Sequence, residues 1–413
     1  MRAVNIATQP SADDRLRTLR AIRRALCRAT IFILLLVAAI SPLAQEQPGR
    51  VAKPSSEQKS EIIAPGVEHL QIVRGVKSDK EATGPWFINI LRIDLAQARL
   101  QMVHALDEAV GLETVSSLAA RHGALAGVNS GYFRTTGTYR GDSVGVEVLN
   151  GKLMSEPNNV RAAVGLIEGD KKQELILGHL EFEGEIVAGG KAEHAIGGLN
   201  RPRGDNELLI FTPEFHRTTL TDPNGLELVV RRGRVVEQRD HKGSSVIPSD
   251  GYVIAASGSA RDWAVQNLRP GTRVRLILNT SPTENEQTNL WKRATSIVGG
   301  GPQLIKNGRV EITNAAEKIL PAFVSDGHPR TAIAKLKSGQ VLLVTVDGRQ
   351  PGESIGMSLP MLAELLLEFG ALEAINLDGG GSTTMVIKNK LVNKPSDATG
   401  ERPVSDAILI FPR

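Results

Sequence analysis

Short runs of apolar residues dominate the chain from about residue 66 onward, and Gly, Asn, Asp and Pro separate them at short intervals. Runs of this length bounded by turn residues are typical of β-strands. Asn-Gly pairs at 150–151, 224–225 and 307–308 are typical of tight turns between such strands. The pattern predicts strands at 67–73, 85–94, 100–105, 124–129, 144–149, 175–177, 208–211, 225–231, 252–256, 274–278, 341–346, 374–377 and 383–387.

Helical signals are few and have recognisable ends. Residues 113–121 predict a helix that stops at Gly123, because glycine readily adopts the left-handed conformation that caps a helix. Residues 359–369 predict a second helix, with Ser358 as its N-cap and Gly370 after its last turn. The chain is therefore predicted to be an α+β protein, with strand-rich mixed sheets and a few packed helices in a single large domain.

Residues 1–44 have the form of an export signal. An Arg-rich stretch ends at Arg28, the apolar run 29–40 follows, and a small residue stands at Ala44. The uncharged stretch is shorter than the roughly 20 residues of a spanning helix. We expect a signal peptide cleaved after Ala44, or an N-terminal anchor if it stays uncut. The protein is thus expected to be secreted or periplasmic, with membrane contact only through an uncleaved leader.

The rest of the chain is predicted to divide into a spacer and one domain. Residues 45–65 are polar, contain Pro and Ser, and predict a flexible linker. Ordered structure is expected from near Gly66 to residue 413. The region 180–290 is more polar than its surroundings, and it could be an inserted subdomain or long loops over a site.

Charge and cysteine content exclude several functions. The net charge is +4, but residues 1–44 hold seven Arg and two Asp, so the leader carries +5 and the remainder −1. A body without a basic surplus is not expected to bind nucleic acid. The single cysteine, Cys27, lies in the leader, which excludes disulfides, thiolate metal sites and a cysteine nucleophile from the domain. The eight His show no ligand-like spacing.

Two aspartates follow apolar strands in the C-terminal third. Asp347 comes directly after the run 341–346, and Asp378 directly after 374–377. If these strands are parallel and joined by the helix at 359–369, both carboxylates emerge at the same edge of a sheet, where ligands bind in such units. The three glycines after Asp378 allow close backbone approach to a ligand and could offer N–H groups to an anion. Ordinary turns are the alternative for both aspartates.

Further candidates lie around these strands. Arg330 opens another apolar run, and arginine is the best side-chain clamp for phosphate, although at a sheet edge it is often only a solvated charge. Residues 141–145 match the G-x-S-x-G pattern of serine hydrolases. That motif needs a helix after the serine, whereas residues 146–151 alternate and turn like a hairpin strand, so no serine nucleophile is predicted.

Several motifs in order resemble one known family. They stand at 127–133 (GVNSGYF), 299–304 (GGGPQL), 328–332 (HPRTA), 347–349 (DGR), 376–382 (NLDGGGS) and 401–404 (ERPV). The set resembles the phosphodiester glycosidase domain family, that of the uncovering enzyme and of secreted bacterial relatives. The resemblance spans roughly 66–413, and its motifs concentrate in 125–150 and 296–413.

The resemblance implies hydrolysis of a sugar-1-phosphodiester, which releases the sugar and leaves a phosphomonoester on the acceptor. It implies a catalytic set in which an aspartate acts as nucleophile or base and an amide hydrogen-bonds the substrate: Asp378, Asp347 and Asn376. It implies a substrate- and phosphate-binding set made of Arg330, Asn129, Gly379, Gly380, Gly381, Ser382, Thr383, His328 and, as a second cation, Arg402. No cofactor is required, although Ca²⁺ or Mg²⁺ could bind near Asp378, since hard carboxylates and phosphates suit these ions.

Two other classes of function stay open. One is a non-catalytic envelope protein that binds phosphate-linked glycans in exopolysaccharide or cell-wall assembly. The other is a phosphodiesterase that breaks the P–O bond. The carboxylates favour an enzyme, because pure sugar binding would rely on exposed aromatic side chains and only 4% of the chain is Phe, Trp or Tyr.

Overall fold

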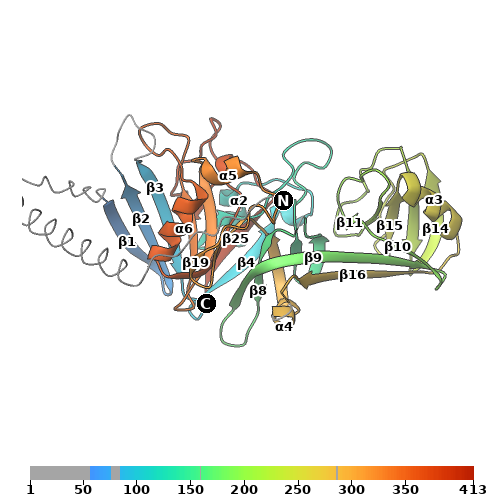
Figure 1. The fold of residues 1–413 in the computed structure, drawn as a ribbon, viewed down its shortest axis with the longest axis horizontal. Helices are drawn as coiled ribbons and strands as arrows, with labels where there is room; N and C mark the ends of the chain where they lie inside the picture. Colours follow the sequence, from blue (N-terminus) through green and yellow to red (C-terminus); the bar gives the residue numbers. More distant parts are fainter. Residues whose placement is uncertain (1–55, 76–83, 159, 285–286) are drawn as a thin grey trace, which may run out of the picture. The chain divides into compact units, whose positions relative to one another are not determined.

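A computed structural model describes residues 56–75, 84–158, 160–284 and 287–413 (Figure 1). The predicted leader 1–44 and the first part of the predicted linker, 45–55, lie outside the described residues. Within the described ranges, the helices are all too short or too polar to cross a membrane.

The largest sheet has eight strands in the order β1-β2-β3-β21-β20-β22-β18-β19. β20 is antiparallel to both of its neighbours, so β21 and β22 run parallel to each other on either side of it. The strands are β1 (Ser56–Ala64), β2 (Val67–Arg74), β3 (Trp86–Ile93), β18 (Gln303–Lys306), β19 (Arg309–Val310), β20 (Arg330–Leu336), β21 (Val341–Val346) and β22 (Ala371–Asn376).

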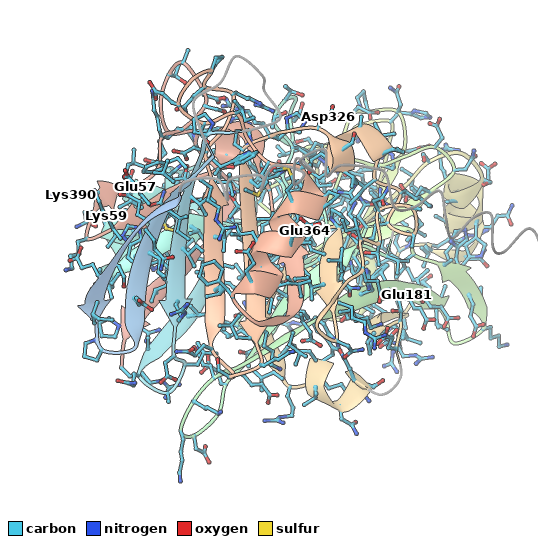
Figure 2. The ribbon with its side chains drawn as sticks, turned by 60° about the vertical axis from the view of Figure 1, so that its left-hand side comes forward. Glu57, Lys59, Glu181, Asp326, Glu364 and Lys390 are labelled. Atoms are coloured by element: carbon cyan, nitrogen blue, oxygen red, sulfur yellow. The ribbon has the colours of Figure 1, made fainter. Side chains whose placement is uncertain are left out.

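Helix α6 (Leu359–Glu368) connects β21 to β22 and covers one face of this sheet (Figure 1). Its buried side chains, among them Leu362 and Leu366, pack with Ile88 and Val344 of the sheet, whereas Glu364 points outward (Figure 2). The Ser358 side chain accepts a hydrogen bond from the Met361 N–H and so caps the helix as predicted. The short helix α5 (Pro321–Ser325) precedes β20.

The opposite face of the eight-stranded sheet packs on a five-stranded sheet. Leu91 and Leu343 meet Met102 and Ile408 in the core between the two sheets. Helix α2 (Val115–His122) covers the outer face of the second sheet. It has Thr114 as its N-cap, two residues later than the predicted start at 113 implies, and it ends at left-handed Gly123 as predicted. The second sheet has the order β24 (Lys390–Leu391), β23 (Met385–Ile387), β5 (Ala126–Asn129), β25 (Asp406–Pro412) and β4 (Ala98–His104).

A third sheet leads into a subdomain. β9 and β16 form a long antiparallel pair, and the chain between them folds into a sheet with its own core (Figure 1). The third sheet holds β10 (Ala192–Ala195), β9 (Glu174–Ala188), β8 (Ala162–Ile167), β17 (Ala294–Gly299), β6 (Glu147–Leu149), β7 (Lys152–Ser155) and β16 (Val274–Pro282), with α4 (Thr288–Trp291) beside it. The subdomain holds β11 (Gly198–Leu199), β12 (Leu208–Phe211), β13 (Leu226–Arg231), β14 (Arg234–Asp240), β15 (Gly251–Ala256) and α3 (Gly258–Asn267).

The prediction of a strand-rich chain with several sheets and few helices is confirmed. The predicted flexible linker 45–65 is wrong over Ser56–Ala64, which form β1 and pair along β2. The sequence pattern did not predict this strand because most of its residues are polar. β1 is an edge strand that pairs with β2 through its backbone, and side chains such as Glu57 and Lys59 are exposed (Figure 2). Ordered structure therefore begins before Gly66.

Candidate active site

The predicted site residues gather where the two packed sheets meet at one end. β22 ends at Asn376, which lies opposite Ala332 near the start of β20. Asn129, at the end of β5 in the other sheet, accepts a hydrogen bond from the Thr331 hydroxyl (2.8 Å) and donates to the Asp378 carbonyl (2.7 Å). Because β21 and β22 are parallel, Asp347 and Asp378 follow strands that end at the same edge, as the sequence predicted.

The surroundings of Asp378 raise the pKa of its carboxyl. Burial raises the pKa of its carboxyl to about 7, and the negative charge of Asp406 raises it further, while Ser382, the Gly379 N–H and Arg402 oppose the rise. The Gly379 N–H donates to Oδ1 at 2.9 Å, and the Asp378 N–H donates to the Ser130 carbonyl at 2.9 Å. A carboxyl with a pKa near 7 can both give and accept a proton at neutral pH.

Buried acids that the sequence analysis missed lie beside Asp378. Asp406 accepts hydrogen bonds from the Ser130 hydroxyl (2.6 Å) and from a backbone N–H. Burial raises the pKa of Glu147 to about 7, and the charge of Asp406 adds to this. His104 lies opposite Asp406 in the β4–β25 pair, and its Nε2 is 3.6 Å from a Glu147 oxygen. The β4–β25 pairing brings His104 and Asp406 together, and Glu147 of β6 reaches His104 from another sheet, so no local motif could have shown them.

Tyr132 and Asn376 form the next part of the site. The Tyr132 hydroxyl donates to the Gly301 carbonyl (2.7 Å), and the Asn376 amide donates to that hydroxyl (2.9 Å). Burial and the charge of Asp378 hold the pKa of Tyr132 well above its usual value, so the phenol stays protonated. The buried Oδ1 of Asn376 has no hydrogen-bond partner among the described residues.

The carboxylate of Asp347 is held by the protein itself. The Asn393 amide donates to Oδ1 (3.1 Å) and the Lys394 N–H to Oδ2 (2.9 Å). Burial raises the pKa of Asp347 to about 6, and these two donors limit the rise. Both oxygens therefore anchor the 393–394 segment, which makes Asp347 a weaker catalytic candidate than Asp378.

The predicted phosphate-binding cations are also engaged within the protein. Arg330 is 1% exposed, and its guanidinium donates from Nε to the Met357 carbonyl and from Nη2 to the Phe323 and Asp326 carbonyls, each at 2.8 Å. These bonds leave only Nη1 for other partners. Arg402 makes a two-point ion pair with Asp397 (2.8 and 3.0 Å). We conclude that both arginines mainly hold the loops around the site.

His328 is the less constrained member of the predicted phosphate-binding set. Its Nδ1 is buried and lacks a hydrogen-bond partner in the described part of the chain. Burial lowers the pKa of its imidazole, and the positive charges of Arg330 and Arg349 lower it further. His328 is therefore neutral at pH 7 and can act as a hydrogen-bonding group.

The glycine loop does not form the anion cradle that the sequence suggested. Its N–H groups are largely used inside the protein: Gly380 donates to the Pro329 carbonyl (2.9 Å), Ser382 to the Gly379 carbonyl (3.2 Å) and Thr383 to the Gly380 carbonyl (3.3 Å). Close packing explains the glycines instead. A Cβ at Gly379 would lie 2.7 Å from the Pro329 carbonyl, and one at Gly381 would collide with Arg402.

The serine of the G-x-S-x-G pattern is not a nucleophile. Strand β6 and a tight turn follow Ser143 in place of a helix, and its hydroxyl donates to Glu147 (2.7 Å). This confirms the prediction against a serine hydrolase. The same segment contributes Asp142, whose pKa burial raises to about 8 against the opposing charge of Arg134.

Two cavities lie near these residues. A cleft of about 580 Å³ is lined by residues that include Arg134, Gly145, Glu156 and Arg201. It shares residues 143–145 with a small space bordered by Tyr132, Glu147 and Asp406, so the cleft adjoins the site.

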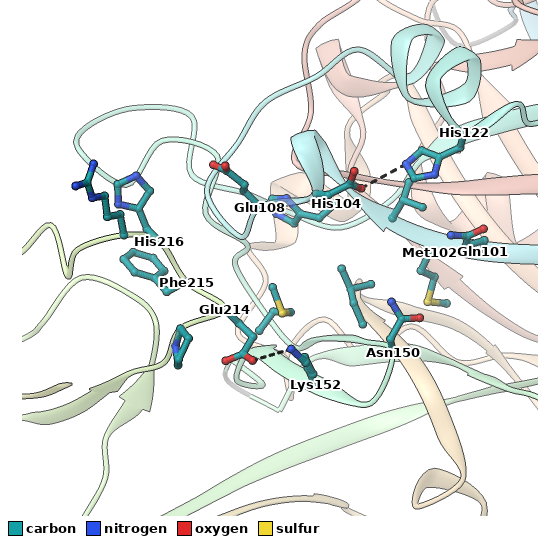
Figure 3. Close-up of a pocket in the computed structure, with 16 residues that line it drawn as sticks. Gln101, Met102, His104, Glu108, His122, Asn150, Lys152, Glu214, Phe215 and His216 are labelled. Atoms are coloured by element: carbon teal, nitrogen blue, oxygen red, sulfur yellow. Dashed lines mark ion pairs between the residues drawn. The ribbon is translucent and has the colours of Figure 1, made fainter. Parts of the chain in front are cut away.

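The second cavity, of about 660 Å³, lies between β4, the β6–β7 turn and residues 213–217 (Figure 3). The Lys152–Glu214 ion pair (3.1 Å) lies in its wall. None of the residues predicted for the site lines it. Across the described ranges, His, Cys, Asp and Glu form no group of three or more that could hold a metal ion.

The motifs thus surround a half-buried acid at the strand ends of two packed sheets. The phosphodiester glycosidase family model matches residues 224–411, which confirms the resemblance to that family. N-acetylglucosamine-1-phosphodiester alpha-N-acetylglucosaminidase of Mus musculus is 32% identical over 161 residues, which are 37% of this chain and 30% of that enzyme. The chain thus matches less than a third of that relative's length.

Solved structures share the fold over most of the chain. A protein of Burkholderia pseudomallei K96243 has a TM-score of 0.77 at 24% identity, covering 87% of this chain and 97% of that one. A hypothetical protein of Synechocystis has a TM-score of 0.73 at 25% identity, covering 86% and 64%. The architecture, including most of the described strands, is therefore shared with these bacterial proteins.

Proposed function

We propose that this protein hydrolyses a sugar-1-phosphodiester, releasing the sugar and leaving a phosphomonoester on the acceptor. The observation that carries the proposal is Asp378, a half-buried carboxyl at the strand ends where two sheets meet, whose pKa is raised to about 7. The family match and the name of the mouse relative support this substrate class.

The residues around Asp378 fit the chemistry of this bond. Water adds to the anomeric carbon, the C–O bond to phosphate breaks, and the phosphomonoester leaves as an anion. Asp378 takes the proton of the water, while the carboxylates near it stabilise positive charge on the sugar. The free Asn376 oxygen accepts a hydrogen bond from a sugar hydroxyl, and His328 is a second ligand for a polar group. A phosphate leaving group needs little acid assistance, so no cofactor is required for this step.

The reaction is tested with a panel of sugar-1-phosphodiesters in oxygen-18 water, beginning with N-acetylglucosamine-1-phosphodiesters. We expect the label on the released sugar and full activity after EDTA treatment. Label on the phosphate would show P–O cleavage and refute the glycosidase. Absence of turnover, with tight glycan binding that survives Asp378→Ala, would instead identify a non-catalytic glycan-binding protein.

We also propose that the protein works outside the cytoplasm, since residues 1–44 have the pattern of an export signal. The mass of the mature N-terminus tests this. A start at residue 45 is expected for a cleaved signal and Met1 for an anchor. Recovery of the intact chain from the cytoplasm would contradict export.

A further inference from the structure

Arg161 is a half-buried arginine close to the site, and one nitrogen of its guanidinium has no partner among the described residues. Arg161 immediately precedes β8, and its guanidinium carbon lies 5.6 Å from the centroid of the Tyr132 ring. Its Nε is buried and makes no hydrogen bond to any described residue. An N–H donor removed from water without an acceptor costs free energy, which an incoming anion would recover.

The neighbouring arginines differ from Arg161 because each lies within ion-pair distance of a carboxyl group. Arg134 pairs with Asp142 (3.2 Å), and Arg201 pairs with Glu156 (2.5 Å). Both of these arginines line the 580 Å³ cleft. Arg161 itself does not line the cleft, but it directly follows Val160, which does, and no described carboxylate forms an ion pair with it.

The backbone before Arg161 is strained. Val160 has a φ of +55°, a region that β-branched residues rarely occupy because of steric clash. Asn158 and Val160 both line the 580 Å³ cleft, so the strained turn lies in its wall. Strain of this kind persists where the surrounding structure holds a segment in place, and it concentrates at ligand sites.

A short series of contacts connects Arg161 to the Asp378 carboxyl through Tyr132. Arg161 stacks on the Tyr132 ring, the Tyr132 hydroxyl bonds to Asn376, and the charge of Asp378 acts on the same hydroxyl. An anion that contacts Arg161 beside the Tyr132 ring would thus lie near Asp378.

We propose that Arg161 is the residue that binds the phosphate of the substrate, and that the 580 Å³ cleft holds the group attached to this phosphate. The proposal rests on the proposed function. It assigns phosphate binding to Arg161 in place of Arg330 and Arg402, whose guanidinium groups are engaged within the protein.

Binding of N-acetylglucosamine 1-phosphate and of free N-acetylglucosamine, measured by calorimetry on the wild-type protein and on Arg161→Ala, tests the proposal. In Arg161→Ala, loss of a charged hydrogen bond should weaken the affinity for the sugar phosphate by about 10- to 100-fold. The affinity for the free sugar should stay within about twofold of the wild-type value. Arg161→Lys should fall between, since it keeps the charge without the planar fork.

Two further variants sharpen the result. Arg99→Ala removes another stacked arginine, 4.2 Å from the Phe411 ring centroid and outside the site, and should bind both ligands as the wild type does. Arg349→Ala removes the exposed arginine beside Gly380, and it should keep most of the preference for the phosphate.

The proposal would be overturned if Arg161→Ala lost affinity equally for both ligands or lost none. It would also be overturned if Arg349→Ala, and not Arg161→Ala, lost the preference for the sugar phosphate. A different result would refute the proposed function without refuting the phosphate site. A wild-type protein that binds the sugar phosphate through Arg161 but turns over no diester would refute the glycosidase and keep the phosphate site.

Discussion

Asp378→Asn should make the folded protein more stable at pH 8 while abolishing the proposed hydrolysis. The pKa of Asp378 is about 7, against an ordinary value of 3.8. Between these values the folded state keeps a proton that the unfolded state has released, so the free energy of unfolding falls as pH rises. The fall is about 1.4 kcal/mol per pH unit, or about 4 kcal/mol over the whole interval.

Asparagine is a suitable replacement because it is neutral at every pH and keeps an oxygen for the Gly379 N–H, which donates to Asp378 at 2.9 Å. The stability advantage of the variant over the wild type should grow by about 3 kcal/mol between pH 5 and pH 8. Urea unfolding at several pH values measures this difference, and initial rates on a sugar-1-phosphodiester measure the loss of activity.

Asp94→Asn provides a control of opposite sign. The Ala96 N–H and the Gln97 side chain lower the pKa of Asp94, so its charge stabilises the fold above the ordinary pKa, and that stability is lost as pH falls. The Asp94 variant should therefore be the less stable one at neutral pH. If the advantage of Asp378→Asn stayed constant from pH 5 to pH 8, Asp378 would titrate normally and the acid–base role assigned to it would be wrong.

Three other substitutions test the framework around the site. Gly141→Ala should destabilise the fold by about 2 kcal/mol or more, because Gly141 has a φ of +95° and a Cβ would lie 2.6 Å from the Gly111 carbonyl; a wild-type midpoint in urea would contradict this. Thr114→Ala removes the oxygen that accepts from the Ser117 N–H at the start of α2 and should cost about 1 kcal/mol, with activity unchanged. Asn129→Ala should cost about 2–4 kcal/mol and lower kcat more than tenfold with little change in KM, since Asn129 positions Asp378 through its carbonyl. A variant that lost binding but kept kcat would place Asn129 on the substrate instead.

Local signals in the sequence predicted the elements that carry Asp378. Ser358 and Gly123 mark helix ends by their own conformational preferences, and the apolar run 341–346 is a strand because it is buried on both faces. The parallel relation of β21 and β22 followed from the helix between them. The insertion of β20 between these strands could not be predicted, because it depends on pairing with residues far away in the sequence.

The chemistry around Asp378 was harder to predict because it depends on tertiary contacts. The motif at 328–332 identifies Arg330 as a candidate. It cannot show that the Arg330 guanidinium donates hydrogen bonds to three carbonyls. Asp406 reaches the site because β25 pairs with β5, where Ala407 lies opposite Asn129. Arg161 carries no local signal at all, and only its stacking on Tyr132 identifies it.

The β9–β16 pair has a consequence for how such a protein can diversify. The two strands pair from Leu180 with Pro282 to Ala188 with Val274, so the chain leaves and returns at adjacent, hydrogen-bonded positions. The segment 189–273 could therefore be shortened, exchanged or replaced by a tight turn without breaking the sheet that carries it. Since Arg201 of this segment lines the cleft while Asp378 lies outside the segment, such an exchange would change the wall of the cleft and leave the residues around Asp378 unchanged.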